Sequence, residues 1–133
     1  MISIPLEIYD ELIEHAHTGF PLEVCGILGG KGDTVSVLFR MTNTDASNEH
    51  FAMEPREQFD VVKALRAGGN AMLAIYHSHP ESPARPSDED IKLALTPGVS
   101  HVIISLQNAE QPVIRSFKIE DGVVVPEEIG ILE

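Results

Sequence analysis

The stretch YHSHPESPARPSDED, residues 76–90, gathers metal-capable side chains directly behind an apolar run, and this arrangement decides the expected fold. Residues 71–75 form a short, continuous apolar block after a glycine pair, which is typical of a strand buried on both faces. His77 and His79 end this strand. Because strand residues two apart share a face, both imidazoles can lean onto one ion. Pro80 has no amide hydrogen to donate and ends the strand there.

A helix is expected to begin at Ser87, after a proline-punctuated loop, with Asp90 on its first turn. Ser87-x-x-Asp90 before an apolar run also fits a capping box, and the pair taken alone favours that interpretation. With His77 and His79, however, Asp90 supplies an N, N, O ligand set. That set leaves a fourth position for water, as in catalytic zinc sites. The sequence therefore predicts a Zn²⁺ site.

Composition limits the classes of protein that fit. The chain has 133 residues and a formal net charge of −12, which suits one domain over residues 1–133 and argues against nucleic-acid partners. No apolar run approaches the roughly 20 residues that span a bilayer, so no membrane partner is expected. The first residues lack the features of a signal peptide, and a cytoplasmic location is expected by default. Cys25, the one cysteine, is expected to be a buried small hydrophobe rather than a nucleophile.

Periodicity and turn residues predict helices and strands in a mixed order. Helical spacing covers about 5–18, 54–67 and 87–95, and strand patterns cover 21–28, 34–40, 71–79, 101–106, 113–119 and 123–125. On the second helix, Phe59, Val62 and Leu65 or Arg66 are expected to face inward. This order favours an α/β fold with a mixed sheet and helices packed against it.

Three places outside the central stretch carry expectations of their own: Glu23, the segment 42–53 and His101. Glu23 lies at the mouth of an apolar strand, and position alone favours a solvent-exposed flank. The polar segment 42–53 is expected to be a surface loop, whose His50 and Phe51 could contact a substrate, with packing an equal alternative for Phe51. His101 is expected at a sheet edge.

Taken together, these residues resemble the JAMM/MPN+ zinc metallopeptidases. That family has an upstream glutamate followed by His-x-His-Pro, six residues, Ser, two residues and Asp. Glu23, the segment 77–80, Ser87 and Asp90 match every element, and the similarity extends over almost the whole chain. The resemblance implies a three-layer, cytidine-deaminase-like α/β sandwich. It also implies zinc ligands at His77, His79 and Asp90, a general base at Glu23, and Ser87 as a helper for the oxyanion.

The resemblance further implies hydrolysis of a peptide or isopeptide bond after the C-terminal Gly-Gly of a ubiquitin-like or sulfur-carrier protein. Zinc would polarise the carbonyl and activate water, and Glu23 would carry the proton to the leaving amine. Only six residues separate Pro80 from Ser87, which favours a small carrier over one ubiquitin linkage. A diglycine tail could add beside an exposed sheet edge. We expect a monomer or weak homodimer.

Two alternatives remain open from the sequence. A non-catalytic MPN-type protein-binding scaffold would have the same fold and would not need the metal. A zinc deaminase acting on nucleobases would also fit the fold class. The deaminase alternative lacks the expected Pro-Cys-x-x-Cys and His-x-Glu signatures.

Overall fold

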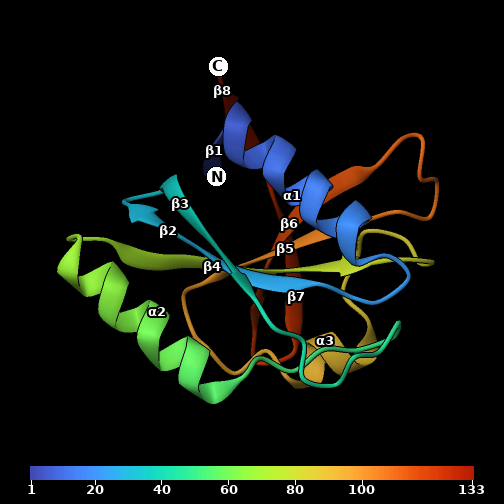
Figure 1. The fold of residues 1–133 in the computed structure, drawn as a ribbon. Coiled ribbons are helices and arrows are strands. Elements are labelled where there is room, and N and C mark those ends of the chain that lie inside the picture. The colour runs from blue at the N-terminus through green and yellow to red at the C-terminus, as the bar shows by residue number, and fades with distance from the viewer.

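An eight-stranded sheet with helices on both faces makes up the computed structural model, which describes all 133 residues (Figure 1). The elements in chain order are β1 (Ile2–Pro5), α1 (Leu6–Gly19), β2 (Cys25–Lys31), β3 (Thr34–Met41), α2 (Pro55–Ala67), β4 (Ala71–His79), α3 (Asp88–Lys92), β5 (Ser100–Ser105), β6 (Val113–Glu120), β7 (Val123–Glu127) and β8 (Ile129–Leu132).

The sheet is mixed and β4 lies near its centre. The strand order is β7-β6-β5-β4-β2-β3-β1-β8. β4 pairs parallel with β5 and antiparallel with β2, and β1 pairs parallel with β3 and β8. Figure 1 shows α1 on one side of the sheet and α2 and α3 on the other. The predicted mixed sheet in a three-layer α/β arrangement is therefore confirmed.

Strand β4 divides the core between the two faces. Alternate residues Ala74 and Tyr76 join the larger apolar cluster, which also contains Leu12 and Ala16 of α1. The opposite face carries Ile75, His77 and His79 by the same alternation. A smaller cluster there holds Val61 and Leu65 of α2 against Cys25 and Ile27. The histidine pair thus projects from the face that α2 and α3 cover.

Several predicted boundaries were wrong. The strand predicted over 21–28 runs from Cys25 to Lys31, because Gly29 and Gly30 continue the ladder and only the residues after Lys31 turn. The helix predicted over 87–95 is shorter, spanning Asp88–Lys92. β1 and β8 were not predicted, since each has four residues and each depends on pairing with the opposite end of the chain.

The inner face of α2 also differs from the prediction. Phe59 is 62% exposed, whereas Val61 and Leu65 are buried. Val61 and Leu65 are four residues apart and share one helix face, from which Phe59 is turned away. The Lys63 ammonium lies 5.4 Å from the Phe59 ring centroid at the surface.

Tyr76 is a buried anchor between the sheet and α1. Its ring is fully buried, and its hydroxyl lies 2.7 Å from His15 Nδ1. Burial raises the pKa of the Tyr76 phenol and lowers the pKa of His15 to about 4, so Tyr76 donates to a neutral imidazole. On the neighbouring strand, Gly26 is the residue that leaves room for the Tyr76 ring.

We expect Gly26→Ala to lower the free energy of unfolding by about 1–3 kcal/mol, because the added methyl group would overlap the buried Tyr76 ring. Chemical denaturation measures the loss. Gly130→Ala is the matched control, since a methyl group there would meet only the Met1 and Ser3 side chains at ordinary contact distances. Equal stability of the two variants would contradict this account of Tyr76 packing.

Candidate metal centre

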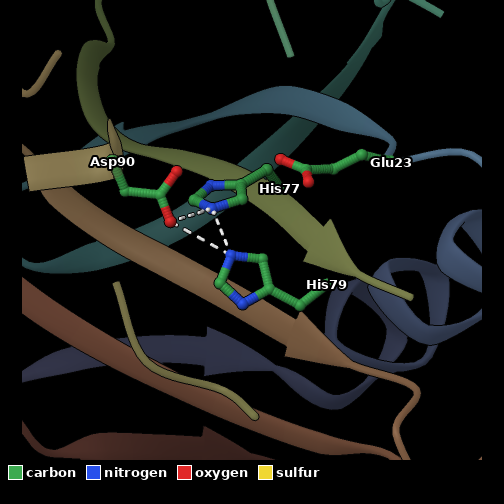
Figure 2. Close-up of side chains that lie close together, drawn as sticks. All are labelled: Glu23, His77, His79 and Asp90. Atoms are coloured by element: carbon green, nitrogen blue, oxygen red, sulfur yellow. Dashed lines mark hydrogen bonds and ion pairs between the residues drawn. The ribbon is translucent and has the colours of Figure 1, made fainter. Parts of the chain in front are cut away.

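Four acidic and imidazole side chains from three segments converge at the end of β4. Glu23 precedes β2, His77 and His79 end β4, and Asp90 lies on α3. One potential ligand atom from each lies within 4.8 Å of the others. Figure 2 shows His77, His79 and Asp90 facing a common point, with the Glu23 carboxylate beside His77. The structure therefore brings together all four residues that the sequence singled out for metal binding and proton transfer.

The three nearest ligand atoms form a small triangle. His77 Nε2 lies 3.2 Å from His79 Nε2, and Asp90 Oδ2 lies 3.1 Å and 3.0 Å from these two nitrogens. A tetrahedral zinc ion with bonds of about 2.0–2.1 Å places its ligand atoms about 3.3 Å apart. The spacing and the N, N, O donor set therefore fit one metal ion held by His77, His79 and Asp90.

The outer nitrogens of the two imidazoles differ in their partners. His79 Nδ1 donates to the carbonyl of Pro83 at 2.8 Å, so Nε2 is the nitrogen that becomes an acceptor when the ring is neutral. Such a bond orients a metal-ligating imidazole and sets its tautomer. His77 Nδ1 is buried and has no hydrogen-bond partner. Phe51 instead stacks on the His77 ring, with centroids 4.7 Å apart and planes at 25°.

Glu23 is buried, so the solvent-exposed flank that its position suggested is wrong. Its side chain is only 2% exposed, and Oε1 has no hydrogen-bond partner. Backbone bonds hold it in place, because Glu23 N–H donates to Ser47 and its carbonyl accepts from Asn43. An unpaired buried carboxylate oxygen is costly, and such groups are characteristic of functional sites.

Ser78, between the two histidines, fastens the Glu23 segment to β4. Its Oγ accepts from Val24 N–H at 2.8 Å, and its own N–H donates to the Val24 carbonyl at 3.0 Å. Ser78 is fully buried. The middle residue of His-Ser-His therefore joins two segments that are 54 positions apart in sequence and places Glu23 beside the imidazoles.

The pKa values of the two carboxyl groups at the site, Glu23 and Asp90, are shifted in opposite directions. Burial raises the pKa of Glu23 to about 8. Burial also acts to raise the pKa of Asp90, but hydrogen bonds from His77 and His79 outweigh it and lower that pKa. Burial lowers the pKa of His77. It acts in the same direction on His79, where the hydrogen bonds to Asp90 and to the Pro83 carbonyl outweigh it and raise the pKa. Asp90 is thus an anion near neutral pH, whereas the Glu23 carboxyl group titrates close to that pH.

Ser87 and Asp90 form the predicted capping box. Ser87 Oγ accepts from Asp90 N–H at 3.0 Å, and Asp90 Oδ2 accepts from Ser87 N–H at 2.9 Å. The same Oδ2 atom faces both histidines. The cap is therefore geometrically compatible with a metal-ligand role for Asp90, because the oxygen atom that accepts in the cap is the one that faces both imidazoles. The Ser87 hydroxyl accepts in the cap, which leaves its own hydrogen free to donate.

A cavity of about 260 Å³ adjoins the cluster. Its lining includes His77 and Asp90, the loop residues His50 and Phe51, and the end of α3. The Asp45 carboxylate lies 2.9 Å from His50 Nδ1. Both interpretations of Phe51 are thus compatible with its position, since it packs on His77 and also lines the cavity.

His101 is not at a sheet edge, and that prediction was wrong. It lies on β5 between β4 and β6, level with Ile75, and is 8% exposed. It lines the same cavity as His77, and its Nε2 atom has no hydrogen-bond partner.

Cys25 is fully buried, and burial raises the pKa of its thiol to about 12. The prediction that Cys25 is a buried small hydrophobe is therefore confirmed.

Comparison with known proteins identifies the family. The family model described as prokaryotic homologs of the JAB domain matches residues 5–120. The chain belongs to this family of prokaryotic JAB-domain proteins. The resemblance read from residues 23–90 is therefore confirmed.

Two curated relatives of this JAB-domain protein carry names that describe enzymes. The CysO-cysteine peptidase of Mycobacterium tuberculosis is 30% identical, with an alignment covering 100% of this chain and 92% of the relative. The desampylase of Haloferax volcanii is 32% identical over 78% of this chain and 80% of the relative. The predicted enzyme class, a hydrolase that acts as a peptidase, is confirmed by these relatives.

A solved structure extends the comparison to the whole fold. A protein of Desulfitobacterium hafniense, solved in solution, superposes with a TM-score of 0.91 at 44% identity, covering 100% of this chain and 94% of that one. None of the helices in this JAB-domain protein is long and apolar enough to cross a membrane.

Proposed function

We propose that this protein is a zinc-dependent hydrolase that cleaves the amide bond after the C-terminal Gly-Gly of a ubiquitin-like or sulfur-carrier protein. The observation that carries the proposal is the convergence of Glu23, His77, His79 and Asp90 within 4.8 Å. We further propose one catalytic domain over residues 1–133, acting in the cytoplasm as a monomer or weak homodimer.

His77, His79 and Asp90 would hold the ion through Nε2, Nε2 and Oδ2, the three atoms that face one another. A bound zinc ion supplies Lewis-acid polarisation of a carbonyl and lowers the pKa of water to about 7. The outer hydrogen bond of His79 and the stacking of Phe51 on His77 keep the two rings oriented. Zinc is the ion that we propose, since it binds imidazole nitrogen and carboxylate oxygen ligands.

Glu23 would take a proton from the attacking water and deliver it to the leaving amine. Its carboxyl group is buried beside the ligand atoms, and a pKa of about 8 in the metal-free chain suits a group that must both accept and donate near neutral pH. Ser87 would donate its uncommitted hydroxyl hydrogen to the developing oxyanion. Asp90 cannot share the base role, because its facing atom is committed to the two histidines and to the cap.

The substrate proposal rests on the relatives and on the shape of the site. The curated relatives include the CysO-cysteine peptidase, two desampylases and a probable TtuB-protein conjugate cleaving protease. Both sides of β4 are paired, and the sheet edges are β7 and β8. The strand that bears the histidines therefore offers no free edge to an incoming tail, which would instead lie across the sheet face in the adjoining cavity.

Release of an adduct from a carrier protein tests this proposal. We expect the zinc-loaded protein to free a small amine from a sulfur-carrier protein whose C-terminal Gly-Gly bears that amine in amide linkage, and a chelator to stop the reaction. Mass spectrometry of the carrier follows the release. No cleavage of sulfur-carrier or ubiquitin-like adducts by the zinc-loaded protein would overturn the proposal.

We expect the affinity for zinc to rise with pH between about pH 6 and about pH 8. The Asp90 hydrogen bond raises the pKa of His79 against the effect of burial, so the metal-free chain holds a proton that a ligand must lose. Burial raises the pKa of Glu23 to about 8, and this group holds a second proton. Because a falling pH favours the protonated forms of both His79 and Glu23, zinc binds less tightly at low pH.

Calorimetry in buffers of different ionisation enthalpy counts the protons released when zinc binds. The Glu23→Gln variant separates the two sources, since it removes only the carboxyl proton. An affinity that does not change with pH, with no proton release, would contradict the assigned ligand protonation.

A further inference from the structure

The cavity beside the metal cluster extends away from it along the sheet. His77 and Asp90 form the end nearest the cluster, and Ile75 and His101 lie further back on β4 and β5. In the parallel register His77 is level with Ile103 and Ile75 is level with His101. His101 is therefore about two residues, or roughly 6.6 Å, behind the level of His77 along the strand direction.

His101 has a buried nitrogen that no group in the protein satisfies. The residue is 8% exposed, and Nε2 is without a hydrogen-bond partner. A buried polar atom left unpaired destabilises a fold, and a purely apolar side chain would serve the core better at this position. Because His101 is part of the cavity wall, a hydrogen-bonding group held in the cavity lies next to this imidazole.

The walls of the cavity limit what it can hold. Phe51, Met53, Leu93 and Ala94 make much of the lining apolar. Glu89 and Asp90 add carboxylates near the metal end, which disfavour an anionic group such as a free α-carboxylate. The lining thus suits an extended, uncharged peptide segment whose backbone still needs hydrogen-bond partners.

We propose that His101 is a substrate-binding residue that hydrogen-bonds the backbone of the tail just upstream of its Gly-Gly. This inference rests on the proposed function, since it needs the scissile bond at the metal cluster. An extended chain advances about 3.3 Å per residue, so the two glycines span the distance from the cluster to the level of His101. The residue before the diglycine then lies against the imidazole, and an uncharged residue there is the best fit.

Kinetics on two fluorogenic amides of different length test this placement. One probe is Gly-Gly joined to an aminocoumarin, and the other carries three further uncharged residues before Gly-Gly. For His101→Phe we expect KM on the long probe to rise by about tenfold, the loss of one neutral hydrogen bond, with kcat little changed. The short probe should be cleaved by wild type and variant with the same KM and kcat.

Stability and metal content separate binding from a structural role. His101→Phe keeps a flat ring and removes the buried, unpaired Nε2 atom, so we expect an equal or higher Tm and unchanged zinc content. His101→Gln retains hydrogen-bonding capacity and should recover part of the KM on the long probe. His17→Gln, on the exposed surface of α1 across the sheet, is the control.

An unchanged KM on the long probe for both His101 variants, with wild type active, would overturn the role of His101 and leave the proposed function standing. Equal losses on the long and short probes would also overturn it. If the wild-type protein cleaves neither probe nor any carrier adduct, the proposed function fails and this inference fails with it.

Discussion

Replacing Glu23 with glutamine is expected to reduce amide cleavage by about 10²–10⁴-fold while the protein keeps its metal. Glutamine has nearly the same shape and can remain in the buried position beside His77, but it cannot accept and return a proton at neutral pH. Single-turnover cleavage of a carrier adduct, measured with the zinc content of the same sample, tests this separation. The expected loss falls on kcat, because no binding contact of the substrate has been assigned to Glu23.

A matched control tests whether the loss of any one carboxylate reduces cleavage. Glu7→Gln removes an exposed carboxylate in the first turn of α1, on the opposite face of the sheet, and should leave cleavage unchanged. The Glu23→Gln variant should be at least as stable as wild type without metal, because burial already disfavours the ionised carboxylate. Full activity of Glu23→Gln would remove Glu23 from the base role.

His77→Ala is expected to lose both the metal and the activity. The substitution removes one of the three ligand atoms that lie 3.0–3.2 Å apart, and it leaves a gap beneath the Phe51 ring. Zinc content measured by mass spectrometry should fall to background after dialysis, and cleavage should fall below detection. Because the side chain is 2% exposed, the cavity should also lower stability by about 1–3 kcal/mol.

His17→Ala is the control for His77→Ala, since His17 is an exposed histidine in the last turn of α1. Retention of a full equivalent of zinc by His77→Ala would show that the ligand assignment is wrong. Loss of zinc with retained cleavage would refute a metal-dependent reaction.

The convergence of His77, His79 and Asp90 could be predicted from the sequence because it depends on local geometry. His77 and His79 share a strand face by alternation, and Ser87 and Asp90 are placed by the start of a helix. Ser87 and Asp90 taken alone favour a helix cap, and together with the histidines they are predicted to be cap-positioned residues turned toward the metal. The structure is compatible with that prediction, because one carboxylate oxygen of Asp90 accepts from Ser87 N–H and also faces both imidazoles.

The place of Glu23 could not be derived from its own neighbourhood. Position favoured solvent, and only the family resemblance gave it a role at the site. The decisive contacts are long-range, since the Val24 backbone bonds to Ser78 and the Glu23 backbone bonds to the loop at Asn43 and Ser47. Such contacts leave no periodic signal in the sequence.

His101 lies on a central strand, and the residues that follow it indicate that position. Val102 to Leu106 is a nearly continuous apolar run, which is typical of a central strand buried on both faces rather than of an edge. That signal could have placed His101 in the interior. His101 lies beside Ile75 because β5 pairs parallel with β4, and the sequence does not specify that pairing.

Metal titration of the stripped protein tests the central claim most directly. Cleavage of a carrier adduct would be measured as zinc is returned in steps to chelator-treated wild-type protein. The account predicts no cleavage without metal, a linear rise, and a plateau at one zinc per chain, because His77, His79 and Asp90 make one site. Cleavage that persists in the stripped protein, or that ignores the added zinc, would contradict it.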